Sequence, residues 1–89
     1  MINRTVEIIN KLGLHARAAS KFVKTSSGFA SEITLRKGSR RANGKSIMGV
    51  MMLAASCGSV LELTVDGSDE AAATAALEKL IADRFGEAE

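Results

Sequence analysis

The 89 residues of the chain suffice for one compact domain and are too few for two, so we expect a single domain over residues 1–89. A net charge of +2, with three Phe and no Trp or Tyr, argues against a nucleic-acid-binding domain, which needs a strongly basic surface or aromatic side chains for base stacking. One cysteine cannot form an internal disulfide, and no apolar run is long enough for a signal peptide or a membrane span. We therefore expect a cytoplasmic protein, with Cys57 as a small buried residue.

The first part of the chain predicts two strands separated by one helix. Polar and apolar residues alternate over residues 5–8 and again over 32–36, which is the period of a half-buried strand. Between them, helical spacing begins at Ala16, and the predicted inner face consists of Ala19, Phe22, Val23 and Ser26. Gly28 follows where a left-handed residue commonly ends a helix, so we expect it to be the C-terminal cap.

The middle of the chain predicts a hairpin and a short helix. Lys37-Gly38-Ser39 has the composition of a turn, after which residues 40–43 are expected to form a further strand. Ser46 then precedes residues 47–53, which are apolar on nearly every side. Serine is a favoured N-cap, so this segment is predicted to be a short helix that begins after Ser46.

The last part of the chain predicts one more strand and one more helix. Residues 61–66 alternate, and Ser68 can cap a helix whose first turn carries Asp69 and Glu70. Its inner stripe is expected to contain Ala73, Leu77, Leu80 and Ile81. The resulting order does not support a doubly wound parallel sheet, and it favours an α+β fold in which helices cover one face of an antiparallel sheet.

The single histidine has a position that is chemically informative. His15 stands between the Gly13-Leu14 loop and the predicted helix start, and Arg17 follows it closely. Backbone N–H groups at a helix start, including those of Ala16 and Ala18, stabilise an anion. An imidazole nitrogen is a nucleophile near neutral pH, so a phosphoryl group on His15 could be neutralised by Arg17. Position alone favours the simpler interpretation of His15 as an ordinary surface residue or helix cap.

Two separated motifs decide between these interpretations. The segment Gly13-Leu14-His15-Ala16-Arg17 resembles the phosphorylation-site signature of HPr, the phosphocarrier family of the bacterial phosphoenolpyruvate-dependent sugar phosphotransferase system. Residues 43–51 resemble the second signature of that family. The spacing of the motifs, the chain length and the order of elements agree with the family throughout. The resemblance implies an open-faced β-sandwich, in which three helices cover one face of a four-stranded antiparallel sheet in the order βαββαβα.

The resemblance also implies a function and its partners. His15 would receive a phosphoryl group on Nδ1 from phosphorylated enzyme I and donate it to an enzyme II A component for sugar uptake. Such a protein is a phosphoryl relay with a phosphohistidine intermediate rather than a stand-alone enzyme, and we expect a monomer without cofactor or metal. The alternative is a related carrier in a regulatory, nitrogen-type relay without sugar transport. Ala18 stands where family members commonly have proline, and both residues suit a first helical turn.

Ser46 and the residues after it have more than one interpretation. Ser46 is either only an N-cap or, as the resemblance implies, also the regulatory site that a serine kinase or phosphorylase acts on in some members. Phosphate there would add about −1.5 to −2 charges beside an apolar surface. We expect at least half of four apolar side chains to be core and the rest to dock partners, namely Ile47, Met48, Met51 and Met52. A basic rim is predicted from Arg17, Lys21, Lys24 and Lys45.

Two other classes of protein fit the sequence less well than the phosphocarrier. Gly44-Lys45-Ser46 ends like a P-loop, but Ser39 stands where that motif needs its first glycine, so a nucleotide-binding protein is rejected. The alternative of a pure interaction module that works through residues 47–53 predicts that His15 is dispensable. Neither class explains the Gly-Leu-His-Ala-Arg motif.

Overall fold

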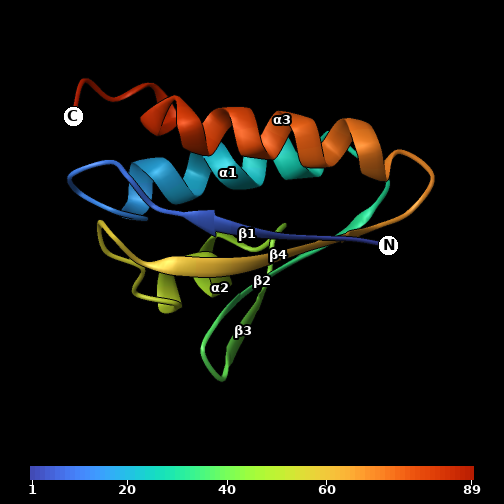
Figure 1. Ribbon diagram of the computed structural model, residues 1–89, viewed down its shortest axis with the longest axis horizontal. Helices are drawn as coiled ribbons and strands as arrows, with labels where there is room; N and C mark the ends of the chain where they lie inside the picture. The colour runs from blue at the N-terminus through green and yellow to red at the C-terminus, as the bar shows by residue number, and fades with distance from the viewer.

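The alternating segments form one antiparallel sheet in the computed structural model, which describes residues 1–89. The strands are β1 (Ile2–Glu7), β2 (Glu32–Lys37), β3 (Arg40–Asn43) and β4 (Val60–Asp66), in the spatial order β1-β4-β2-β3 (Figure 1). Leu63 of β4 lies opposite Leu35 of β2, which in turn lies opposite Ala42 of β3. The four predicted strands are confirmed, and β1 begins three residues earlier than the alternation indicated.

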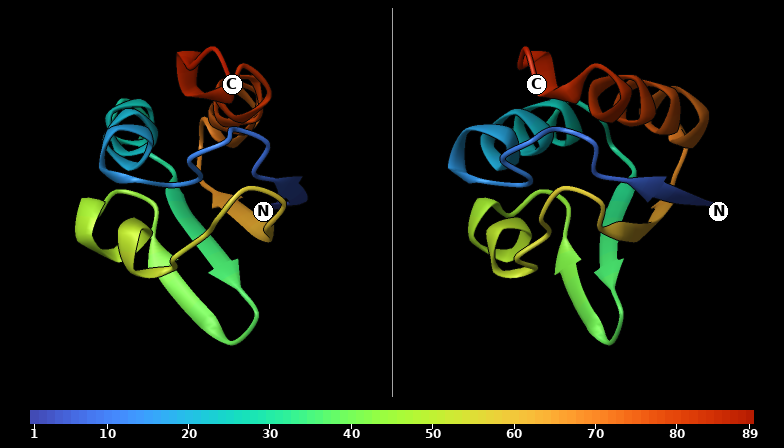
Figure 2. Two further views of the ribbon diagram at one scale, coloured as in Figure 1. Left: turned by 90° about the vertical axis from the view of Figure 1, so that its left-hand side faces the viewer. Right: turned by 60° about the vertical axis from the view of Figure 1, so that its left-hand side comes forward.

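Three helices cover one face of this sheet. They are α1 (Ala16–Ser27), α2 (Ile47–Met52) and α3 (Glu70–Ala82). Figure 2 shows α1 and α3 lying over the sheet, with the short α2 beside α1 and near β3. The predicted order βαββαβα is confirmed, and a short 3₁₀ turn, η1 (Arg84–Gly86), follows α3 and was not predicted. None of the helices has the length and apolar character that crossing a bilayer requires.

The core lies between the sheet and the helices. Inward-facing strand residues such as Leu35, Leu61 and Leu63 are almost completely buried, and Phe22 of α1 and Leu77 of α3 pack against the same core. The opposite face of the sheet carries polar side chains, among them Arg36, Glu62 and Thr64. Since the buried apolar side chains point to only one side, the sheet is open on the other, as the α+β prediction required.

The ends of two helices differ from the predictions. Gly28 has a φ of −77°, so it is right-handed rather than left-handed, and its N–H closes the helix by donating to the Thr25 carbonyl. At the start of α3 the N-cap is Asp69 and not Ser68. The Asp69 carboxylate makes no cap hydrogen bond because it accepts from the N–H groups of Ala30 and Ser31 instead. Leu80 is only partly buried in the inner stripe of α3.

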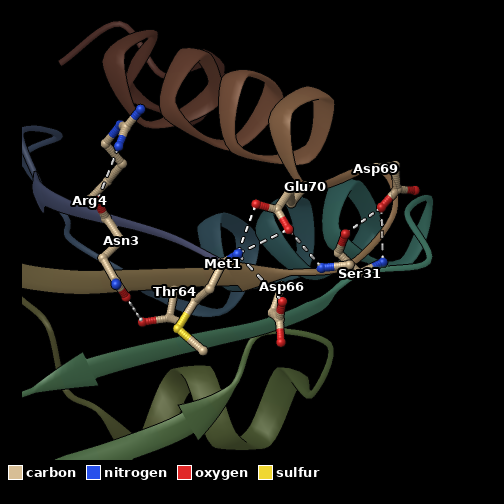
Figure 3. A network of polar contacts seen from close by, with 9 residues as sticks. Met1, Asn3, Arg4, Ser31, Thr64, Asp66, Asp69 and Glu70 are labelled. Carbon is tan, nitrogen blue, oxygen red and sulfur yellow. Dashed lines mark hydrogen bonds and ion pairs between the residues drawn. The ribbon is translucent and has the colours of Figure 1, made fainter.

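A polar network closes the end of the domain that lies away from His15 (Figure 3). The amino group of Met1 contacts a Glu70 oxygen at 3.0 Å, and the Ser31 hydroxyl donates to Asp69. These hydrogen bonds lower the pKa of both carboxyl groups, with Ser31 as the first cause for Asp69 and the Met1 amino group for Glu70. The network therefore joins β1 and the start of β2 to the start of α3.

Cys57 lies in the loop between α2 and β4 and is exposed, so the prediction of a buried thiol is wrong. Its sulfur is 3.7 Å from the Ile9 carbonyl oxygen. The reason is that Leu53 and Ala55, rather than Cys57, turn inward in this loop and fill the core.

Candidate functional site

His15 is itself the N-cap of α1. Its backbone is extended, with φ −72° and ψ 179°, and its carbonyl accepts the N–H of Ala19 at 2.8 Å. The ring nitrogen Nδ1 faces the Arg17 N–H at 3.4 Å, while the N–H groups of Ala16 and Ala18 have no hydrogen-bond partner in the chain. The imidazole therefore stands at the positive end of α1, beside free donors suited to an anion.

The loop before His15 is fixed against the segment that follows α2. The Leu14 N–H donates to the Ala55 carbonyl at 2.8 Å, and the Leu14 side chain is buried. Gly13 has a φ of +70°, and a Cβ at this position would be 2.5 Å from the Ala55 oxygen. Only glycine allows both this backbone conformation and this close approach. The position of His15 thus depends on contact between two distant loops.

Arg17 lies at the site with its side chain exposed and without an ion pair in the chain. It lines a surface hollow together with His15 and Ala16, and the remaining lining residues are Lys11, Leu12, Glu87, Ala88 and Glu89. An unpaired guanidinium in this hollow is free to neutralise phosphoryl oxygens. The structure therefore brings together His15, Arg17 and the free N–H groups of the helix start.

The C-terminal tail completes this hollow and was not predicted as part of the site. One Glu87 oxygen lies 2.5 Å from His15 Nε2, and the other accepts from the side-chain amide of Asn10 at 3.0 Å. Asn10 is fully buried and also donates to the Gly13 carbonyl at 2.8 Å. Figure 1 shows the tail lying beside the loop that leads into α1. Because His15 and Glu87 are 72 positions apart, no local motif could indicate this contact.

Charge and hydrogen bonding act together on Glu87. The hydrogen bond from Asn10, followed by the contact with His15, lowers the pKa of the Glu87 carboxyl below its ordinary value. Glu87 is consequently a carboxylate at neutral pH, able only to accept hydrogen bonds. The chain brings no group of three or more His, Cys, Asp and Glu side chains together that could hold a metal ion.

The predicted basic rim is only partly assembled around His15. Lys21 donates to the Phe85 carbonyl at 2.6 Å, which places it beneath the C-terminal tail. Lys45 donates to the Phe29 carbonyl at 2.6 Å, beyond the other end of α1 from His15. Lys24 is exposed in the last turn of α1. Of the four predicted rim residues, Arg17 and Lys21 are thus the two that lie near the histidine.

Ser46 caps α2 as predicted, because its hydroxyl accepts the N–H of Gly49 at 3.1 Å. The expectation that at least half of four named side chains are core is wrong, since all four are 38–69% exposed, namely Ile47, Met48, Met51 and Met52. A six-residue helix needs only one inward position, and Val50, followed by Leu53, provides the buried contacts. The exposed apolar surface of α2 is therefore larger than predicted.

Comparison with solved structures gives the class of protein that this fold and site define. The structure of HPr-C-His from Thermoanaerobacter tengcongensis matches with a TM-score of 0.96 and 48% identity, and the match covers all of both chains. The architecture is thus that of a small histidine-containing phosphocarrier.

Sequence comparisons are consistent with this class. The family model described as "PTS HPr component phosphorylation site" matches residues 2–83. The phosphocarrier protein HPr of Neisseria meningitidis is 58% identical over 89 residues, and the match covers both chains completely. The phosphocarrier protein NPr of Shewanella violacea is 41% identical over 87 residues, covering 98% of this chain and 96% of the relative. The chain belongs to the HPr family of phosphocarriers of the phosphotransferase system.

Proposed function

We propose that His15 is the residue on which this phosphocarrier receives its phosphoryl group, from phosphorylated enzyme I, and from which it donates the group to an enzyme II A component. The observation that carries the proposal is the placement of His15 Nδ1 at the start of α1, opposite the Arg17 N–H. His15 is also the only histidine of the chain, and the family model for the phosphorylation site includes it.

The transfer uses groups that already surround the histidine. Nδ1 attacks the phosphorus of the donor, so a nitrogen–phosphorus bond forms as the bond to the donor's carrier atom breaks. The charge on the phosphoryl oxygens is met by the N–H groups of Ala16, Arg17 and Ala18 and by the Arg17 guanidinium. Donation to the next partner is the same exchange in reverse, so no cofactor is needed.

Mass measurement after incubation with phosphoenolpyruvate and enzyme I tests this assignment. One acid-labile phosphoryl group is expected on the wild-type chain and none on His15→Ala. Arg17→Ala is expected to slow the reaction about tenfold or more, because charge-assisted hydrogen bonds to a phosphoryl group are among the strong ones. Arg41→Ala is the matched control, since Arg41 is exposed, belongs to β3 and does not line the hollow around His15. Phosphate on His15→Ala would refute the assignment.

The exposed face of α2 is the docking surface in this proposal, formed by Ile47, Met48, Met51 and Met52. Unbranched, polarisable methionine side chains adapt to several partners in turn. Replacing Met48 with glutamate is expected to raise the KM for enzyme I, because a charge would be buried in the contact. The same change at Val60, an exposed apolar residue in β4, is the control and should leave the KM unchanged.

Ser46 is proposed as a regulatory phosphorylation site in addition to its role as a cap. A phosphate at the start of α2 would remain compatible with the helix and would place about −1.5 to −2 charges beside the docking surface. Treatment with the organism's serine kinase should modify wild-type protein and not Ser46→Ala, and the modified form should react more slowly with enzyme I. Absence of modification by that kinase would refute this role.

We propose that the protein is a cytoplasmic monomer that carries phosphoryl groups for sugar uptake. The higher identity to the HPr relative than to the NPr relative supports it over a regulatory relay. Purified phosphorylated protein should therefore transfer its phosphoryl group faster to a sugar-specific enzyme II A component than to a nitrogen-type one. The opposite preference would favour the regulatory relay.

A further inference from the structure

We infer that Glu87 is a positioning residue for phosphoryl transfer, because its carboxylate holds the Nε2–H of His15 and thereby leaves the lone pair on Nδ1, at the start of α1. The inference rests on the proposed phosphorylation of His15. It assigns a role in the reaction to a tail residue that lies 72 positions from the histidine.

The tautomer follows from the two partners of the ring. A carboxylate can only accept, so the nitrogen that lies 2.5 Å from Glu87, Nε2, must carry a proton. On the other side of the ring, the Arg17 N–H can only donate, so Nδ1 must be the acceptor. A neutral imidazole has one nitrogen of each kind, and the two contacts therefore select the same tautomer. This tautomer presents its nucleophilic nitrogen to the free N–H groups of the helix.

The tail is held firmly enough to keep this orientation. The Glu87 side chain is 14% exposed and that of His15 29%, so the pair is largely shielded from water. The buried Asn10 amide binds the second Glu87 oxygen, and the fully buried Phe85 anchors the chain two residues earlier. Lys11 adds two contacts to Glu89, through its N–H at 2.9 Å and its ammonium group at 3.3 Å.

Glu87 also sits where charge develops in the reaction. When Nδ1 bonds to phosphorus, the ring gains positive charge. The proton on Nε2 is then shared more strongly with the Glu87 carboxylate, which stabilises that charge. The other charged groups around the ring are Arg17, Lys11, Lys21 and Glu89. The Arg17 backbone N–H faces Nδ1, Lys21 donates to the Phe85 carbonyl, and Glu87 is the one carboxylate in contact with the ring.

Glu87→Gln is the most informative variant because glutamine keeps the shape of the side chain and replaces one of the two carboxylate oxygens with an amide donor. Glutamine has one oxygen, and if that oxygen keeps the Asn10 contact, its amide group faces Nε2 and donates. The proton is then displaced to Nδ1, where it meets the Arg17 N–H and blocks the nucleophile. Glu87→Asp preserves the charge and the acceptor, and it should restore most of the rate. Glu32→Gln changes an exposed carboxylate at the start of β2, which touches neither the tail nor His15, and serves as the control.

Two readouts on the whole chain test the inference. Nitrogen NMR of the His15 ring should show the Nε2–H tautomer in wild type and an increased share of the Nδ1–H tautomer in Glu87→Gln. The kcat for phosphorylation by enzyme I should fall about tenfold in Glu87→Gln, the loss expected for a hydrogen bond to a charged group. KM should change little because α2 is untouched, and circular dichroism establishes that each variant is folded.

The outcomes separate this inference from the proposed function. If wild type is phosphorylated on His15 and Glu87→Gln reacts as fast or faster with an unchanged tautomer, Glu87 has no positioning role. If wild type receives no phosphate on His15, the proposed function fails, and the ring tautomer in Glu87→Gln still decides whether Glu87 orients the histidine.

Discussion

Substituting Gly13 with alanine should damage both the stability and the reactivity of the protein. A left-handed conformation at φ +70° costs a residue with a Cβ about 1–2 kcal/mol. The new Cβ would also lie 2.5 Å from the Ala55 oxygen and 2.8 Å from the Ser56 Cα, and backbone atoms cannot rotate away. The loops must separate, which weakens the Leu14–Ala55 hydrogen bond by about 0.5–1.5 kcal/mol. We expect a total loss of about 3 kcal/mol in the free energy of unfolding.

Gly38→Ala is the matched control for this effect. Gly38 has a similar φ of +61°, but a Cβ there meets nothing within 4 Å, so only the backbone strain remains. Urea unfolding followed by far-ultraviolet circular dichroism suits the measurement, since the chain has no Trp or Tyr for fluorescence. Gly13→Ala should also be phosphorylated more slowly by enzyme I, while Gly38→Ala should react normally. Equal stability losses in the two variants would refute the close-approach argument.

Three further outcomes follow from the helices and the tail. Ser46→Ala removes the acceptor for the Gly49 N–H and should cost about 1 kcal/mol of unfolding free energy, measured in urea; no loss would show that the cap is not used. Because folding lowers the pKa of Asp69, its carboxylate stabilises the fold at pH values above the ordinary pKa of aspartate. This stabilisation is lost as the pH falls through the pKa of the folded state, so Asp69→Asn should be less stable than wild type at neutral pH and equally stable in acid. Unfolding in urea at both pH values tests this, and a difference that persists in acid would contradict it. Phe85→Ala should cost about 3–5 kcal/mol and broaden the NMR signals of residues 87–89, because Phe85 is 1% exposed and anchors the tail; unchanged tail signals would refute the anchoring role.

The elements themselves could be predicted because their signals are local. A period of two placed three of the strands, and the hairpin turn at Gly38 placed the fourth, β3, at the predicted residues. Ser46 was identified as a cap for the same reason, since a cap hydrogen bond reaches only three residues along the chain. These features are determined by neighbours in sequence.

Other features depend on contacts that sequence spacing does not show. Residues 47–53 are apolar on nearly every side, so periodicity could not indicate that only Val50 and Leu53 turn inward. Asp69 was expected in the first turn of α3, whereas the N–H groups at the start of β2 draw its carboxylate away from the helix. The contact between Glu87 and His15 depends on the path of the chain after α3, where Arg84 and Phe85 both adopt a positive φ. No local rule predicts such a turn for these two residue types.

Phosphoryl donation by the isolated, phosphorylated chain tests the central claim most directly. The chain would be phosphorylated by enzyme I and then purified away from enzyme I and phosphoenolpyruvate. It would next be mixed with an enzyme II A component while the intact masses of the two proteins are followed. The phosphocarrier account predicts that His15 loses one phosphoryl group as the enzyme II A component gains one. Retention of the group on His15, or its release only to water, would contradict the account.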